Sequence, residues 1–255
     1  MATTTTAKPA AAKSSLGLNY GTGLTLLSVV MMLFALYMAF VFAPDAANLQ
    51  TDVERFSQRI LYFHVGSAWV GFFAFFVTFV AGIMYLIKRQ FFWDNMSYAS
   101  VEAGLTFLTM MLVSGSIWAK PTWNVWWTWS PRLTITAISW LLYIGYLMLR
   151  GAIDDPDRRA RFSAVFSIVA FISVPINFMA IRWWRDIHPA VVGSGASEGE
   201  GGFAMSDDMR NTLLYCVVAF TVFYVTLMYH RMRLGQTAHE VETLKQEVAY
   251  RESAR

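Results

Sequence analysis

Five of the ten tryptophans in this chain lie in one short segment, between Trp118 and Trp129. The segment reads WAKPTWNVWWTWSPRLT and carries Lys120 and Arg132 near its edges. Tryptophan combines an apolar ring with an N–H that stays hydrated, so one or two such residues are enough to anchor a membrane protein at the interface. Five together indicate a flat aromatic platform for a large, planar, apolar molecule with anionic groups on its rim.

Histidine is the second residue type with chemistry of its own, and it occurs only four times. His64 lies in RILYFHVGSAW and His188 in IRWWRDIH, while His230 and His239 follow the last apolar run. Neutral imidazole is a common ligand for metal ions. The chain has a single cysteine, Cys216, and no CxxC or CxxCH, so it is predicted to be neither a c-type cytochrome nor a thiol reductant.

Long apolar runs must position these residues. With 56% hydrophobic residues, 15% charged residues and a mean hydropathy of +0.43, the chain is predicted to be a polytopic membrane protein. Each run is long enough for a helix to cross a hydrocarbon layer of ~30 Å, whereas barrel strands would be shorter and would alternate. The runs are Tyr20–Ala43, Ile60–Ile87, Ser97–Ala119, Leu133–Leu149, Phe162–Ile181 and Thr212–Tyr229. We therefore predict an all-α bundle of six transmembrane helices.

Lysine and arginine in the short connections predict how the bundle is oriented. The arm before the first run has Lys8 and Lys13 and no acidic residue. Further cations follow the second, fourth and sixth runs, at Lys88, Arg89, Arg150, Arg158, Arg159, Arg161, Arg231 and Arg233. Both termini are therefore expected to be cytoplasmic. The net charge of +3 and the isoelectric point near 9.0 reflect this bias, without any need for nucleic-acid binding.

The predicted organisation has three parts. Residues 1–19, rich in Ala, Thr, Lys and Ser, are expected to be a disordered cytoplasmic arm. Residues 20–230 form the six-helix domain, with a tryptophan-rich outer loop at 118–132 and a glycine-rich flexible loop at Val191–Met205. Residues 231–255 form an amphipathic tail, because Leu234, Val241 and Val248 are spaced by seven. We expect this tail to cap the bundle or to contact a cytoplasmic partner.

Counting spans places the tryptophan segment, His64 and His188 together at the outer face. The iron of a porphyrin has two axial positions that imidazoles can fill, and the macrocycle stacks on indole rings. Its propionates need cationic partners, and Lys120, Arg132, Arg182 and Arg185 are the candidates. Zinc would need three or four N or S ligands, and the outer face supplies two histidines and no cysteine. The predicted ligand is therefore haem, with His64 and His188 on the iron.

The residues also match a known family. WNVWWTWSPRLT at 123–134 resembles the tryptophan-rich motif WGxWWxWDxRLT of the haem-handling proteins of cytochrome c maturation. RILYFHVGSAW, and the stretch from Val174 to His188 with VPINF and IH, resemble the two histidine-containing segments that flank this motif. Spacing, number of runs and chain length indicate the haem exporter protein C (CcmC) family, over roughly Gly21 to Tyr229.

The resemblance implies a function and a set of partners. It implies that haem b is held non-covalently at the outer face of a bacterial cytoplasmic (inner) membrane, by His64 and His188. The motif tryptophans would contact the haem edge and meet a periplasmic haem chaperone of the CcmE type. They are Trp123, Trp126, Trp127 and Trp129, with Trp118 as a neighbour in the same segment. ABC transporter subunits of the CcmA and CcmB type and a small helical CcmD-type subunit are the further partners implied. The expected action is binding and handover, without catalytic residues.

The sequence departs from the family motif at two positions. Ser130 replaces the acidic residue of the motif and Asn124 replaces its glycine. Serine offers only a neutral hydrogen bond, worth about 0.5–1.5 kcal/mol, so this change concerns chaperone docking more than haem binding.

Two other functional classes remain open for the chain. A quinone-linked electron-transfer subunit would normally hold two haems with four histidines inside the bundle. A haem permease would need a polar path, for which Glu102 is the one candidate, although we favour a structural contact between helices for this residue.

Overall fold

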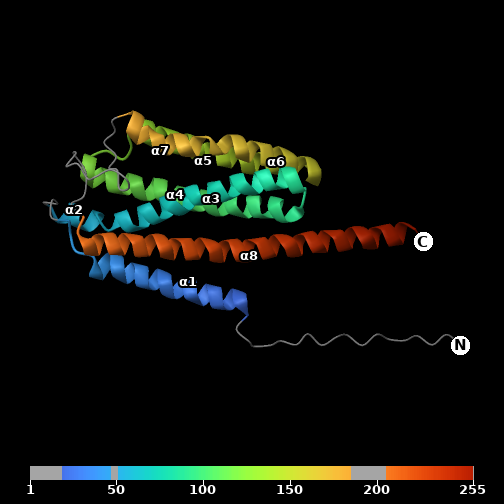
Figure 1. The fold of residues 1–255 in the computed structure, drawn as a ribbon, viewed down its shortest axis with the longest axis horizontal. Helices are drawn as coiled ribbons and strands as arrows, with labels where there is room; N and C mark the ends of the chain where they lie inside the picture. The colour runs from blue at the N-terminus through green and yellow to red at the C-terminus, as the bar shows by residue number, and fades with distance from the viewer. Residues whose placement is uncertain (1–18, 47–50, 185–204, 255) are drawn as a thin grey trace.

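The computed structural model describes residues 19–46, 51–184 and 205–254, and within these ranges the regular secondary structure consists of helices joined by short connections (Figure 1). Six of its helices, including one that is broken in two, are long and apolar enough to cross a membrane. The prediction of an all-α, six-span protein is confirmed. The elements are α1 (Tyr20–Tyr37), the π-helix η1 (Met38–Phe42), α2 (Asp52–Ser57), α3 (Ile60–Lys88), α4 (Phe91–Trp123), α5 (Pro131–Gly151), α6 (Pro156–Phe171), α7 (Ser173–Trp183) and α8 (Asp207–Ser253).

Helices α3 and α4 form the centre of the bundle. Helices α5, α6 and α7 lie on one side of this pair, and α8 followed by α1 lies on the other (Figure 1). Small residues let the helices approach closely: a Cβ at Gly82 of α3 would lie 2.5 Å from Ser167 Oγ of α6. Aromatic stacking fills the core where α3 meets α5, with the Phe75 and Tyr143 rings 3.5 Å apart and nearly parallel.

Three helices differ in extent from the apolar runs of the sequence. Helix α4 starts at Phe91 and ends at Trp123, so it includes the first two tryptophans of the segment. Helix α8 continues without interruption to Ser253. The fifth span is broken at Ile172 between α6 and α7. Pro175 lies in the first turn of α7, and its missing N–H and fixed φ explain why a single straight helix is not formed there.

The far end of α1 is fastened to the start of α3. Arg59 donates hydrogen bonds to the carbonyls of Ala39 (3.2 Å) and Ala43, and it forms an ion pair with Asp45 at 2.7 Å. The arginine thereby satisfies carbonyls that the π-helical end of α1 leaves without helical partners. These contacts hold the start of α3 against the end of α1, about one turn before His64.

The opposite end of the bundle is held by two ion pairs around one tyrosine. Arg150 of α5 binds both carboxylate oxygens of Asp94 of α4, at 2.5 and 2.8 Å, and both side chains are nearly buried. Arg231 of α8 pairs with Glu102 at 2.5 Å. The two guanidinium groups lie 4.7 and 4.9 Å from the Tyr98 ring. Glu102 therefore makes a contact between helices, as expected.

Candidate functional site

Most of the predicted site residues lie at one end of the bundle, which we call the tryptophan end. It consists of the start of α3, the end of α4, the start of α5 and the segment between α4 and α5 (Figure 1). His64 lies on α3, Trp118 and Trp123 on α4, and Arg132 is the second residue of α5. Trp126, Trp127 and Trp129 lie between α4 and α5. His188 and Arg185, like most of the predicted glycine-rich loop, are outside the described residues.

His64 is half-buried against α4. Its Nδ1 lies 3.2 Å from Ser114 Oγ, and this hydroxyl donates a hydrogen bond to the Met111 carbonyl at 3.1 Å. Because the hydroxyl donates its own proton to the Met111 carbonyl, the serine oxygen can accept a hydrogen bond from the N–H of Nδ1. This arrangement favours the tautomer that carries its proton on Nδ1 and a lone pair on Nε2, which is the state that a metal ligand needs.

Gly115 is the reason that the imidazole fits in this position. A Cβ built on this residue would lie 2.8 Å from Cε1 and 3.3 Å from Nδ1 of His64. The absence of a side chain thus lets the ring lie directly on the α4 backbone.

The tryptophans form two edge-to-face pairs instead of one flat surface. The rings of Trp118 and Trp123 are 4.9 Å apart and those of Trp127 and Trp129 are 5.8 Å apart, each pair with an angle of 79° between ring planes. Trp126 and Trp129 are 59% and 77% exposed, while the others are half-buried. The segment therefore has an inner part that lines the end of the bundle and an outer part that faces away from it.

Asn124 ends α4 in the left-handed conformation, with φ of 57°. The motif has glycine here, and asparagine is the non-glycine residue that adopts this conformation most readily, so the departure keeps the turn. Lys120 binds both the Asn124 carbonyl and its side-chain oxygen, each at 3.0 Å. Lys120 therefore stabilises the turn, a role that the sequence did not reveal.

The second departure falls at the start of α5. Ser130 is its N-cap residue and Pro131 its first helical residue. Serine and aspartate are both favoured at N-caps, and proline is favoured at the first helical position, although the Ser130 hydroxyl does not bond to the first turn of the helix. The local structure that the motif specifies thus tolerates both residues.

Asn177 is a residue of this site that sequence reasoning missed. It belongs to the VPINF segment of α7, is almost completely buried, and donates to Thr136 Oγ1 at 2.6 Å and to the Arg132 carbonyl at 3.2 Å. It therefore fastens the first turn of α5, and with it Arg132, to α7. An amide inside an apolar run was the available signal, because buried amides need hydrogen-bond partners.

Comparison with known proteins identifies the family. The family model described as Heme exporter protein C matches residues 3–247. The chain belongs to the heme exporter protein C family.

Several curated relatives in that family resemble the chain over most of its length. It is 32% identical over 219 residues to Heme exporter protein C of Bradyrhizobium diazoefficiens, which covers 86% of this chain and 79% of the relative. It is 31% identical over 216 residues to that of Escherichia coli strain K12, covering 82% and 81%. With the protein of Rhodobacter capsulatus the identity is 28% over 220 residues, covering 86% and 87%. The family predicted from the tryptophan and histidine segments is confirmed.

Proposed function

We propose that this protein binds haem b non-covalently at its tryptophan end and delivers it to a periplasmic haem chaperone during cytochrome c maturation. Membership of the heme exporter protein C family supports haem as the cargo. The observation that carries the proposal is the placement of His64, with Ser114 on its Nδ1 and the tryptophan segment one helical turn further along α4. Haem supplies an iron with two axial positions for nitrogen ligands.

His64 provides the first of these ligands. Its Nδ1 points to Ser114, so Nε2 is the nitrogen that would face the iron. A hydrogen bond on the far nitrogen fixes the ring orientation and raises the basicity of the ligand. Among the described residues no three His, Cys, Asp or Glu side chains cluster as a site for a metal ion. This observation is compatible with haem, because the macrocycle itself binds the iron and the protein needs to supply only two axial ligands.

His188 is the proposed second ligand, and the length of the chain allows it. Trp184 follows the last residue of α7 at the tryptophan end, and His188 comes four residues later. Four residues span at most roughly 14 Å, so the covalent chain limits how far His188 can lie from Trp184. Its role rests on this limit and on the resemblance of the segment to the family.

Arg132 and two buried polar atoms are suited to the rim of the cargo. Within the part of the chain that the structure describes, Trp127 Nε1 and Thr128 Oγ1 are buried without a hydrogen-bond partner. Such groups are costly unless a partner satisfies them, and a propionate carboxylate would accept from both. Arg132 would supply the countercharge for the same propionates.

The exposed tryptophans are the proposed contact for the chaperone. Trp126 and Trp129 project from the same segment that lines the site. Exposed tryptophans in a cluster are typical of residues that dominate protein interfaces. We infer that Trp118, Trp123 and Trp127 hold the macrocycle, while Trp126 and Trp129 meet a CcmE-type chaperone that takes haem from its open edge.

Charge supports the orientation of the protein in the bacterial cytoplasmic membrane. The end of the bundle opposite the tryptophans carries the lysine- and arginine-rich connections, which remain cytoplasmic in most membrane proteins. The tryptophan end would then face the periplasm. Partners of the CcmA, CcmB and CcmD types would join the complex through other surfaces, and no step requires a catalytic residue of this chain.

Absorption spectra of the purified protein test the proposal. The protein with bound haem should show the spectrum of iron with two histidine ligands, and His64→Ala and His188→Ala should each lose or alter it. His239→Ala is the matched control, because His239 stacks on Phe91 at the opposite end of the bundle. Unchanged spectra in both site variants would refute the ligand assignment.

A further inference from the structure

Within the described residues, two hydrogen-bonded contacts join α5 to α7, and they hold different parts of α5. In the first, the side-chain amide of Asn177 donates to Thr136 Oγ1 at 2.6 Å and to the Arg132 carbonyl at 3.2 Å. In the second, Ser139 Oγ donates to Ser173 Oγ at 2.9 Å. The four side chains that make these contacts are buried. Of the two contacts, the first reaches the turn of α5 that carries Arg132.

The Asn177 contact fixes the start of α5 more firmly than a single hydrogen bond would. Thr136 comes four residues after Arg132, so both residues belong to one face of the helix. The two N–H groups of one amide bond to the backbone of the first turn and to a side chain one turn later. Together they restrict both the position of α5 along its axis and its rotation about that axis.

The local sequence does not hold this turn in place by itself. The Ser130 hydroxyl does not bond to the first turn, and Pro131 has no N–H to donate. The first turn of α5 contains no acidic residue, so the Arg132 cation lies at the positive end of the helix dipole, which is unfavourable in an isolated helix. The tertiary contact with Asn177 offsets this local disadvantage.

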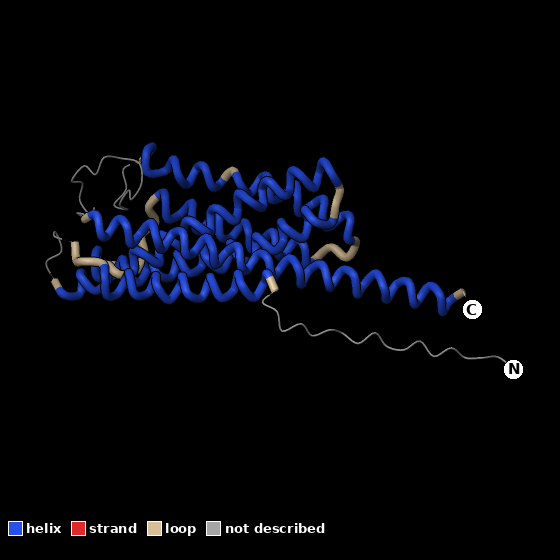
Figure 2. Tube along the Cα trace, turned by 60° about the horizontal axis from the view of Figure 1, so that its bottom comes forward, coloured by secondary structure: helices blue, strands red, loops and turns tan. Residues whose placement is uncertain are grey.

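Helix α7 is anchored to α5 at its other end as well. The fifth span breaks at Ile172, which Figure 2 shows as a short tan segment between α6 and α7. Just after the break, Ser173 donates to the Ala170 carbonyl at 2.7 Å and accepts the hydrogen bond from Ser139. This end of α7 is therefore held independently of Asn177. Loss of the Asn177 amide should free the first turn of α5 without separating the two helices.

We propose that Asn177 is a positioning residue for the carboxylate rim of haem, acting on Arg132 through the first turn of α5. This role rests on the proposed haem binding and on the pairing of Arg132 with the propionates. Asn177 holds the Arg132 cation beside the positive end of the helix dipole, and both favour a carboxylate over a neutral group. The positioning should therefore favour haem over its dimethyl ester and should have little influence on how the macrocycle itself is held.

Titration of two porphyrins into the full-length protein in nanodiscs tests the proposal, with empty nanodiscs correcting for partition into lipid. Haem and haem dimethyl ester share the iron and the macrocycle and differ in the charge of the two carboxylates. The wild-type protein should bind haem about ten-fold or more tightly than the ester, because hydrogen bonds to charged groups are the stronger ones. Asn177→Leu and Thr136→Val should each remove most of this preference by weakening haem binding, with ester binding unchanged. Thr136→Ser, which keeps the hydroxyl, should retain the preference.

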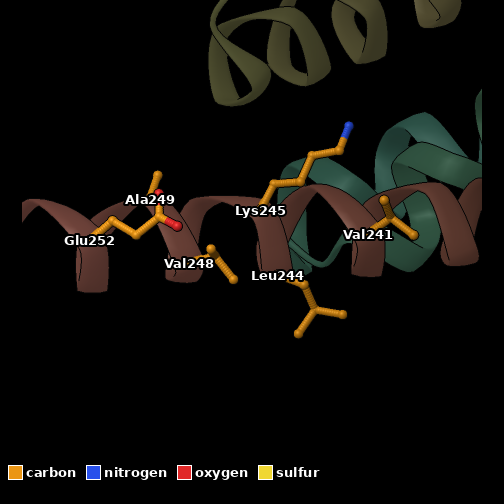
Figure 3. Close-up of a pocket in the computed structure, with 6 residues that line it drawn as sticks. All are labelled: Val241, Leu244, Lys245, Val248, Ala249 and Glu252. Atoms are coloured by element: carbon orange, nitrogen blue, oxygen red, sulfur yellow. The ribbon is translucent and has the colours of Figure 1, made fainter.

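Two control variants separate positioning from general packing. Ser139→Ala is the matched control, since it removes the other contact between the same two helices. Leu244→Ala is a distant control, because this side chain lies in a shallow groove on the last part of α8 and points away from the neighbouring helices (Figure 3). Both controls should keep the wild-type preference. Loss of the preference in Ser139→Ala to the same degree as in Asn177→Leu would overturn the proposal, because any weakening of the contact between α5 and α7 would then suffice.

Hydrogen–deuterium exchange of the haem-free proteins separates this inference from the proposed function. Asn177→Leu should raise the exchange rate of the amides of residues 134–137 by about ten-fold, and Ser139→Ala should not. Unchanged exchange, or equal losses of haem and ester affinity in Asn177→Leu, would overturn the positioning role and would leave haem binding by the wild-type protein in place. A wild-type protein that binds neither porphyrin would refute the proposed function, and the positioning role with it.

Discussion

Gly115→Ala provides a sharp test of how His64 is positioned. The added Cβ would lie 2.8 Å from Cε1 of the imidazole, whereas non-bonded carbon atoms settle at about 3.5–4.0 Å. Because Gly115 belongs to the long helix α4, whose backbone is constrained by its neighbours, the ring must move by roughly 1 Å. That shift would lengthen the 3.2 Å contact with Ser114 beyond hydrogen-bonding range.

The expected loss of affinity follows from two terms. Losing a hydrogen bond costs about 0.5–1.5 kcal/mol, and a side chain forced from its preferred rotamer costs a similar amount. Together they amount to roughly 1–3 kcal/mol, which corresponds to a haem affinity lower by a factor of about 5 to 150. The absorption bands of the bound haem should shift at the same time, because a displaced His64 imidazole changes the ligand field at the iron.

A haem titration of nanodisc-embedded protein, followed by absorption, measures this effect. Gly145→Ala is the matched control: a Cβ there would lie 3.6 Å from the nearest atom of Phe166, which is an ordinary contact. Thermal unfolding of the haem-free proteins would show whether the bundle itself is intact. An unaltered affinity and spectrum in Gly115→Ala, equal to those of the control, would refute the inferred positioning of His64.

Three further predictions concern other parts of the molecule. Ser114→Ala should lower haem affinity by about 0.5–1.5 kcal/mol and alter the absorption spectrum, while Ser114→Thr, which keeps the hydroxyl, should restore both; equal behaviour of the two variants would contradict the tautomer assignment. Asp94→Asn should destabilise the bundle by about 3–5 kcal/mol in thermal unfolding, because it leaves the Arg150 charge nearly buried and uncompensated. The double variant Asp94→Leu with Arg150→Met should recover most of that loss. A double variant no more stable than Asp94→Asn would count against this pairing. Trp129→Ala should slow haem transfer to a periplasmic chaperone at least about ten-fold while leaving bound haem in place, and loss of the haem instead would show that Trp129 holds the cargo.

Much of the bundle was predictable because its signals are local. Six apolar runs specify six helices. The helix ends beside the tryptophan segment were not predicted: the runs stop at Ala119 and resume at Leu133, whereas α4 extends to Trp123 and α5 starts at Pro131. The extent of α4 and α8 was less accessible, since polar residues such as Asp94 and Arg231 interrupt the apolar pattern. Tertiary ion pairs with Arg150 and Glu102 accommodate those charges, and no local pattern reveals such partners.

For the candidate site, the sequence indicated the residue types and the structure provides their arrangement. His64 and the tryptophan segment were predicted to share one end of the bundle, and the contact of His64 with Ser114 places them there. Gly115 and Asn177 were not predicted. Their roles depend on which residues face each other across α3 and α4, or across α5 and α7, and this depends on helix rotation. The apolar pattern sets such rotations only approximately.

The most direct test of the central claim is pulsed electron paramagnetic resonance of the ferric, haem-loaded protein with ¹⁵N-labelled histidine. The account predicts couplings from two histidine nitrogens on the iron in the wild-type protein. One ¹⁵N coupling should be absent in His64→Gly. Unlabelled imidazole added to this variant should occupy the vacant position on the iron and give a ¹⁴N coupling in its place. Couplings from two labelled histidines that persist in His64→Gly, or coordination by no histidine in the wild type, would contradict it.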